Sequence, residues 1–210
     1  MGNEDSNDST KVNGQNVLGR WKHNFSTHSN LTIQGYFDRT WRNATPDSLG
    51  DEMTTFDLDI QHDVVLGKRN RILWGTGYRN VTDKTTGRII FSPANRTLHL
   101  FNAFLQDQVT LVPKKLELTL GTKLLHNEYT GFEWQPSVRL ALTPVTNHTL
   151  WAAVSKAVRT PSRFDRDLKS IQDLPTAPVI SEKVWAYELG YRIRPAENIS
   201  FSLATFYNNY

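Results

Sequence analysis

The sequence contains no cysteine, so it can form neither a disulfide nor a metal site with cysteine ligands. It also has no long hydrophobic segment. Its longest apolar run is 150–154, whereas a membrane-spanning helix needs about 18 or more apolar residues. Residues 1–10 are polar and acidic, so we expect no secretory leader there. With 38% hydrophobic residues the chain is not disordered by composition.

Neither sign of charge dominates, because 24 lysine and arginine residues stand against 21 aspartate and glutamate residues. The sequence therefore gives no electrostatic argument for a nucleic-acid partner. It does contain 11% aromatic residues, among them six tryptophans, at a mean hydropathy of only −0.50. The length of 210 residues would suit one or two soluble domains. The aromatic content is more typical of a protein wall with one apolar face and one face in contact with water.

Apolar and polar residues alternate along much of the chain, whereas a period of 3.6 residues is rare. The clearest stretch is 56–64, in which Asp57, Asp59 and Asp63 share one parity. Three carboxylates on one face of a strand indicate that this face is wet. The alternation predicts an all-β chain with ten strands, at about 15–25, 31–41, 55–66, 71–81, 97–111, 116–125, 135–143, 149–159, 184–194 and 199–210.

The links between the predicted strands alternate between short and long. Short polar turns are expected at 26–30, 67–70, 112–115, 144–148 and 195–198, and longer links at 42–54, 82–96, 126–134 and 160–183. Outer-membrane barrels have this pattern, whereas soluble sandwiches and propellers give no reason for it. The chain is therefore predicted to be an antiparallel, up-and-down transmembrane β-barrel meander.

A membrane-spanning sheet accounts for both faces of the strands. Hydrocarbon requires every backbone polar group to be bonded within the protein, and one face must be apolar while the other can hold charge. Aromatic side chains favour the two interfaces. We expect Trp41, Trp134 and Trp185 near long links and Trp151 near a short turn. The alternative is a soluble β-sandwich that binds carbohydrate through exposed tryptophan and tyrosine side chains.

Several segments, taken in order, resemble the β-barrel of TonB-dependent outer-membrane receptors. They are GRWKHNF (19–25), TIQGYFDRT (32–40), LWGTGYR (73–79), FNAFLQDQVTL (101–111), LELTLGTKLLHNEYTGFEWQPSVRLAL (116–142), TLWAAVSKAVRTPSR (149–163), WAYELGYR (185–192) and FSLATFYNNY (201–210). The resemblance implies about ten strands of a larger, 22-stranded barrel that holds a plug in its lumen. It also implies ligand binding at the extracellular mouth and energy supplied through TonB.

The function implied by the resemblance is uptake of a ferric siderophore or a similar scarce nutrient across the outer membrane of a Gram-negative bacterium. The implied partners are TonB, the small-molecule ligand and outer-membrane lipid or lipopolysaccharide. The sequence departs from the family because no plug precedes the first strand, no TonB box is visible and the chain stops at Tyr210. We therefore expect a barrel fragment, with 1–14 a disordered polar N-terminus and 15–210 a partial receptor barrel.

No catalytic residue, cofactor site or metal site is predicted. The six histidines are scattered over turns and strands, and none lies in a recognisable nucleophile motif. His62 and the nearby aspartates could form a cation site. A wet wall that faces basic residues of neighbouring strands accounts for them better. We therefore expect a protein that is not an enzyme.

Two sets of charged residues are candidates for functional roles. Arginine suits an anionic iron chelate through its charge and its paired donors. The predicted ligand contacts are Lys84, Arg88, Arg163 and Arg166 in the long links and Arg159 at the strand end just before one of them. The predicted lining of the lumen consists of Asp57, Asp59, Asp63, Arg139, Glu188 and Arg192.

Overall fold

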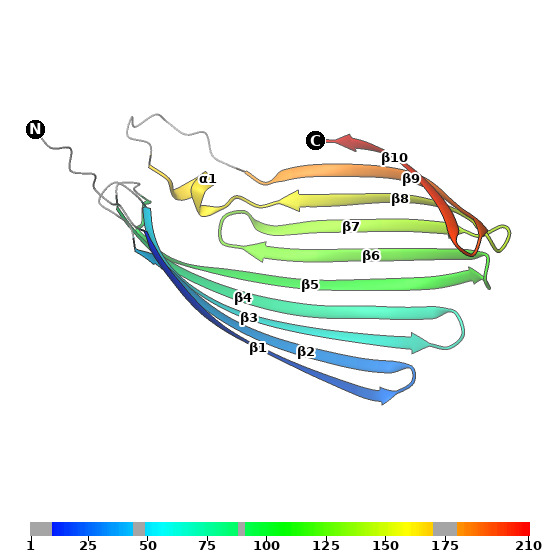
Figure 1. Ribbon diagram of the computed structural model, residues 1–210, viewed down its shortest axis with the longest axis horizontal. Helices are drawn as coiled ribbons and strands as arrows, with labels where there is room; N and C mark the ends of the chain where they lie inside the picture. The colour runs from blue at the N-terminus through cyan, green and yellow to red at the C-terminus, as the bar shows by residue number, and fades with distance from the viewer. Residues whose placement is uncertain (1–9, 44–48, 88–90, 170–179) are drawn as a thin grey trace, which may run out of the picture.

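The computed structural model describes residues 10–43, 49–87, 91–169 and 180–210. These residues form one ten-stranded sheet, in which every strand pairs with the next in antiparallel order (Figure 1). The strands are β1 (Lys11–Ser26), β2 (Ser29–Asn43), β3 (Leu49–Leu66), β4 (Asn70–Gly87), β5 (Asn95–Val112), β6 (Leu116–Asn127), β7 (Gly131–Leu142), β8 (His148–Arg159), β9 (Glu182–Ala196) and β10 (Ile199–Asn209). The predicted all-β, antiparallel, up-and-down meander is confirmed.

The sheet is long, curved and open, with β1 and β10 at its two edges (Figure 1). One end, called the turn end below, carries the short turns 27–28, 67–69, 113–115, 143–147 and 197–198. The opposite end, called the loop end, carries a short helix, α1 (Arg163–Asp167). No helix in the described part of the chain is long and apolar enough to cross a membrane.

The strand register divides the side chains into two faces, because residues directly opposite each other point to the same side. Asp57 lies opposite Arg79, and Asp59 lies opposite Gln34; this side is called the polar face below. Ile33 lies opposite Ile60 on the other side, which is called the apolar face. Pairing continues from β1 to β10, with register shifts in three strand pairs close to the turn end, so the alternation of the strands adds up to two continuous surfaces.

Large side chains on the apolar face are bare. Phe56 is 44% exposed, Leu120 44% and Leu189 56%, and no second sheet covers them within the described residues. A soluble β-sandwich would bury such a face against its partner sheet. The β-sandwich alternative is therefore wrong, and with it the carbohydrate-binding module that it implied.

The strands extend further toward the loop end than the sequence indicated. β6 and β7 pair up to Asn127 and Gly131, so the expected long link 126–134 is a turn of three residues, 128–130. The Asn127 side chain holds this turn by accepting hydrogen bonds from the backbone N–H groups of Tyr129 and Thr130. The polar residues of 126–134 predict a loop, although most of this segment is paired between β6 and β7. The predicted strict alternation of short and long links is therefore wrong at this position.

The first strand also differs from the prediction. β1 begins at Lys11, where Lys11 pairs with Asn43 of β2. The disordered N-terminus was expected to span 1–14, but residues 11–14 belong to the sheet. Polar residues at these positions weaken the alternation of apolar and polar side chains, so the local sequence does not predict a strand. Pairing with β2 places them in the sheet.

β8 separates from β7 before it reaches the loop end. The last pair of the two strands is Ser137 with Ser155, and the next residue of β7 is Pro136, which has no N–H to donate. β8 continues to Arg159 with β9 as its partner. The chain then crosses the polar face, where 160–162 lie against β4 and β5.

Candidate functional site

The polar face carries all six residues that were predicted to line the lumen. Asp57, Asp59 and Asp63 lie on β3, Arg139 on β7, and Glu188 and Arg192 on β9, and the register places them on one side. Arg79 Nε donates to Asp57 Oδ2 at 2.7 Å, and Arg71 Nε donates to Asp63 Oδ1 at 2.9 Å. Basic residues of the neighbouring strand thus face two of the three aspartates. Their position in a lumen stays a prediction.

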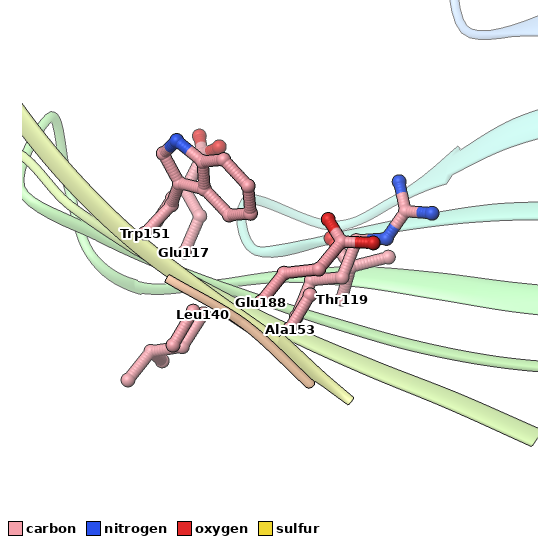
Figure 2. Close-up of a pocket in the computed structure, with 9 residues that line it drawn as sticks. Glu117, Thr119, Leu140, Trp151, Ala153 and Glu188 are labelled. Atoms are coloured by element: carbon pink, nitrogen blue, oxygen red, sulfur yellow. The ribbon is translucent and has the colours of Figure 1, made fainter. Parts of the chain in front are cut away.

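A hollow of about 390 Å³ lies on this face toward the turn end. Its floor includes Ala141 and Ala153, and its walls include the side chains of Glu117, Trp151 and Glu188. Figure 2 shows Glu117, Trp151 and Glu188 on one side of the sheet and Leu140 on the other. The small alanines leave the space that the larger neighbours enclose.

Trp151 is the exception among the tryptophans that were assigned to the membrane interfaces. Trp151 lies opposite Gly190, on the face that carries Glu188. A Cβ atom at Gly190 would lie 2.2 Å from Trp151 Cε2, so the indole ring rests directly on the glycine backbone. Trp151 lies near the short turn 143–147, as predicted, but on the polar face, so its assignment to a membrane interface is wrong.

Replacing Gly190 with alanine is expected to destabilise the sheet by about 1–3 kcal/mol, the usual cost of overpacking a tight contact. The new methyl group would force the Trp151 ring off the strand. The free energy of unfolding in a urea titration measures the effect. Gly35→Ala is the matched control, since nothing lies within 4 Å of a Cβ atom there. An equal loss in both variants would contradict this account.

At the loop end, Arg163 of α1 is buried among partners from three segments. It is 8% exposed, and its Nε donates to Asp167 Oδ2 at 2.9 Å. Its two terminal nitrogens donate to Asp83 Oδ1 and to the carbonyl of Pro93. The guanidinium also lies 5.0 Å from the ring centre of Phe91. Arg163 thus ties α1 to β4 and to the segment before β5.

Asp167 is the second centre of this network. It is 6% exposed and accepts hydrogen bonds from Arg96 Nη1 at 2.9 Å and from the Tyr129 hydroxyl at 2.8 Å. The guanidinium groups of Arg96 and Arg166 lie 4.7 and 5.7 Å from the centre of the Tyr129 ring. Burial, together with the Asp167 carboxylate, raises the pKa of the Tyr129 hydroxyl. The hydroxyl therefore remains a hydrogen-bond donor at neutral pH.

A smaller pocket of about 130 Å³ lies beneath the crossing segment 160–162. Apolar side chains of β4 and β5 form one wall, although they belong to the otherwise polar face. Tyr129 and Pro161 cover the pocket, and Arg79 lies at its edge; the apolar wall consists of Val81, Leu98 and Leu100. Apolar burial and the ion pairs together hold the crossing segment against the sheet.

The start of α1 is capped by Ser162 and Asp165. The Ser162 N–H and hydroxyl donate to Asp165 Oδ2 at 2.8 and 2.9 Å, and the Asp165 N–H approaches Ser162 Oγ at 3.3 Å. This reciprocal arrangement is a capping box. The hydrogen bonds from the Ser162 backbone and side chain hold the pKa of the Asp165 carboxyl below its ordinary range.

The Asp165 carboxyl is therefore expected to titrate below the ordinary value of about 3.9. Because its pKa is lowered in the folded state, the stabilisation is present above the ordinary pKa and is lost as the pH falls through the lowered one. Carboxyl ¹³C NMR in the protein that carries this chain measures the midpoint. Ser162→Ala should move the midpoint upward, and a midpoint at or above the ordinary value in the unsubstituted protein would contradict the capping role.

The family model described as "TonB dependent receptor-like, beta-barrel" matches residues 2–210. The chain belongs to this family. The match covers the whole described sheet and includes the turn and loop ends. Membership agrees with the resemblance of the sequence segments and with the bare apolar face.

The fold of this TonB-dependent receptor-like barrel is similar to that of solved siderophore receptors. The siderophore receptor PirA from Pseudomonas aeruginosa matches with a TM-score of 0.81 and 17% identity, over 95% of this chain and 39% of that chain. PirA from Acinetobacter baumannii matches with 0.76 and 14%, over 95% and 35%. The FrpB iron transporter from Neisseria meningitidis matches with 0.74 and 14%, over 96% and 36%. No curated protein matches the sequence.

At these identities the likeness concerns the fold alone. The chain spans about two-fifths of the length of the first PirA receptor. The fold likeness therefore does not establish the ligand, the partners or the transport activity of this receptor-like barrel, which are proposed below.

The structure brings three of the five predicted ligand-contact residues of the barrel together. Arg159 pairs with Asp165 and Glu182 at 3.2 and 2.6 Å, and Arg163 and Arg166 lie in α1. Lys84 lies on the apolar face, because its neighbour Asp83 is on the polar one. Arg88 lies outside the described residues.

Sequence reasoning missed Asp83, Tyr129 and Asp167, which form the centre of the loop-end network. The spacing of Arg163 and Asp167, four residues apart, was the available signal, since such pairs face each other on a helix. Nothing local in the sequence links them to Asp83, 80 residues earlier. A search of the described residues finds no group of three or more carboxylates and histidines able to hold a metal ion.

Proposed function

We propose that the chain forms part of the wall of a TonB-dependent receptor in the outer membrane of a Gram-negative bacterium. The receptor takes up a ferric siderophore or a similar scarce nutrient. The observation that carries the proposal is the register, which gives one sheet a charged face and a bare apolar face. Family membership and the printed descriptions of the similar structures, siderophore receptors and an iron transporter, support it.

Aromatic contacts on the apolar face support placement in a membrane. Toward the turn end, the rings of His62 and Trp74 lie 5.7 Å apart, and Phe25 lies 6.2 Å from His62. Toward the loop end, the rings of His126 and Phe132 lie 4.5 Å apart. Two aromatic bands at opposite ends of a bare apolar face are typical of a sheet that meets two lipid–water interfaces.

The proposed role is transport and not catalysis. Five of the six histidines occupy the apolar face, namely His23, His62, His99, His126 and His148. They are therefore held apart from the carboxylates of the polar face. TonB is the proposed energy-coupling partner, through the plug that the family resemblance implies, and lipopolysaccharide is the proposed lipid around the loop end.

Within the loop end, we propose Arg159 and Arg166 as ligand contacts. Arg159 keeps 59% of its side chain exposed despite its two acidic neighbours. Arg166 lies over the Tyr129 ring, which gives an anionic chelate a cation and an aromatic surface together. Arg163 is not included, because its guanidinium is buried and committed to Asp83 and Asp167.

Iron-limited growth tests the proposed uptake. The protein that carries this chain is expressed in a Gram-negative host that lacks its own siderophore receptors, with and without TonB. Ferric siderophores are supplied as the only iron source. Growth that depends on both the protein and TonB supports the proposal, whereas growth that persists without TonB contradicts it.

The two arginines are tested by measuring how tightly the transported chelate binds to the purified protein that carries this chain. The double variant R159Q/R166Q is expected to weaken binding of the transported chelate by about tenfold or more, because two charge-assisted contacts are lost. Arg39→Gln is the matched control, since Arg39 pairs with Glu52 on the apolar face. Unchanged binding in the double variant would remove these residues from the proposed site without affecting the proposed transport.

A further inference from the structure

Two neighbouring turns at the turn end carry a cluster of positive charge. The turn 67–69 contributes Lys68 and Arg69, and the turn 113–115 contributes Lys114 and Lys115, all of them exposed. The turns adjoin each other because Thr110 N donates to the carbonyl of Arg69 at 2.8 Å. The four residues are called the basic rim below, and Figure 1 shows both turns at the same end of the sheet.

The acidic residues nearest the basic rim are bonded to other side chains. Asp63 is paired with Arg71, Asp107 accepts a hydrogen bond from Asn70 Nδ2 at 2.7 Å, and Glu117 accepts one from Gln108 Nε2 at 3.1 Å. In the described part of the chain, the four rim side chains have no recorded ion pair or side-chain hydrogen bond. The remaining short turns, 27–28, 143–147 and 197–198, contain no lysine or arginine. Among the five short turns, lysine and arginine therefore occur in these two.

The basic rim continues directly into the apolar face. Leu66, which precedes the first turn, is 50% exposed, and Val112, which precedes the second, is 44% exposed. Further from the turns, Trp74 of β4 is 42% and Leu105 of β5 52% exposed. Long cationic side chains beside such a surface can cover it with their stems and place their charges at the level of lipid headgroups.

We propose that the basic rim binds the phosphate of an anionic phospholipid, such as phosphatidylglycerol, in the leaflet at the turn end. Four cations without acidic partners attract an anionic headgroup, and the apolar side chains above them contact its acyl chains. Because both turns are short, the cations stay close to the lipid boundary. The proposal goes beyond uptake: it depends on membrane placement but on neither the transported ligand nor TonB.

Lipid selection by the purified protein tests the proposal. The protein that carries this chain is kept in detergent with equimolar phosphatidylglycerol and phosphatidylethanolamine, and bound lipid is counted by native mass spectrometry. We expect a preference for phosphatidylglycerol, reduced about tenfold in K68Q/R69Q and again in K114Q/K115Q, since each cation near an anionic lipid contributes several-fold. The preference should also weaken at high salt.

The control variant K11Q/K156Q removes the same number of positive charges at the loop end, where β1 begins and β8 approaches its end. It should keep the preference. Equal binding of the two lipids by the unsubstituted protein, or an unchanged preference in the rim variants, would overturn the proposal. Competition by soluble glycerophosphate at similar concentration, or preferential binding of an acidic peptide to the rim, would also overturn it. Uptake in the growth assay should be unaffected in all these variants, so the two proposals fail separately.

Discussion

Replacing Arg163 with alanine is expected to release α1 from the sheet while the ten strands remain paired. Removing one partner of a buried ion pair costs about 3–5 kcal/mol, because the other charge is left without compensation. Here Asp83 would lose its guanidinium partner, and Asp167, 6% exposed, would lose one of its two and keep Arg96. The loss concerns the loop end alone, because α1 contributes no strand to the sheet.

Hydrogen exchange measures this release. An energy of about 3–5 kcal/mol corresponds to an increase in local opening of roughly two to nearly four powers of ten, confined to residues 160–168 and to the backbone around Tyr129. The bridge between Phe91 and Leu168 and the bond from Ser92 N to the Asp167 carbonyl should open with it. The strands β2 and β3 serve as an internal reference that stays protected.

Arg159→Ala is the matched control for Arg163. Arg159 also faces two carboxylates, but its side chain is 59% exposed, and exposed ion pairs are worth about 0–1 kcal/mol. Arg163→Lys keeps the charge but not the fork of donors, so it should restore only part of the protection. Similar exchange in the two alanine variants would show that the buried network does not hold the crossing segment.

Replacing Leu58 with arginine is expected to destabilise the folded, membrane-inserted protein by about 2–4 kcal/mol, the cost of a cation on the lipid face near the bilayer midplane. Leu58 lies near the middle of β3, on the apolar face, opposite Gly35 and Tyr78. The effect is measured as the change in the free energy of unfolding in lipid vesicles. The folded fraction is read from its mobility in gels run with unheated samples.

Gln61→Arg introduces the same side chain on the same strand, but on the polar face. Gln61 lies opposite Thr32 and Gly75 and is exposed, so the new charge remains in water and should change stability by less than about 1 kcal/mol. The contrast between the two variants isolates the facing of the strand. If Gln61→Arg were as damaging as Leu58→Arg, the assignment of the two faces would be wrong.

The candidate site was only partly predictable. The arginines of α1 could be found because their positive charge stands out in a link between strands. Their separate roles could not be predicted, because the sequence does not show which arginine is buried and which is exposed. Arg163 became a structural anchor because Asp83, Pro93 and Asp167 converge on it, and these residues come from separate segments.

By itself, the sequence determined the alternation of each strand, and through it the strand number, the antiparallel meander and the separation into an apolar and a polar face. Period-two alternation is a local property, so neighbouring residues are enough to specify it. The tertiary structure alone decided the facing of Trp151, the three-residue turn at 128–130 and the network around Arg163. Each of these depends on which residue of a distant segment lies opposite, and the register sets that across the sheet as a whole.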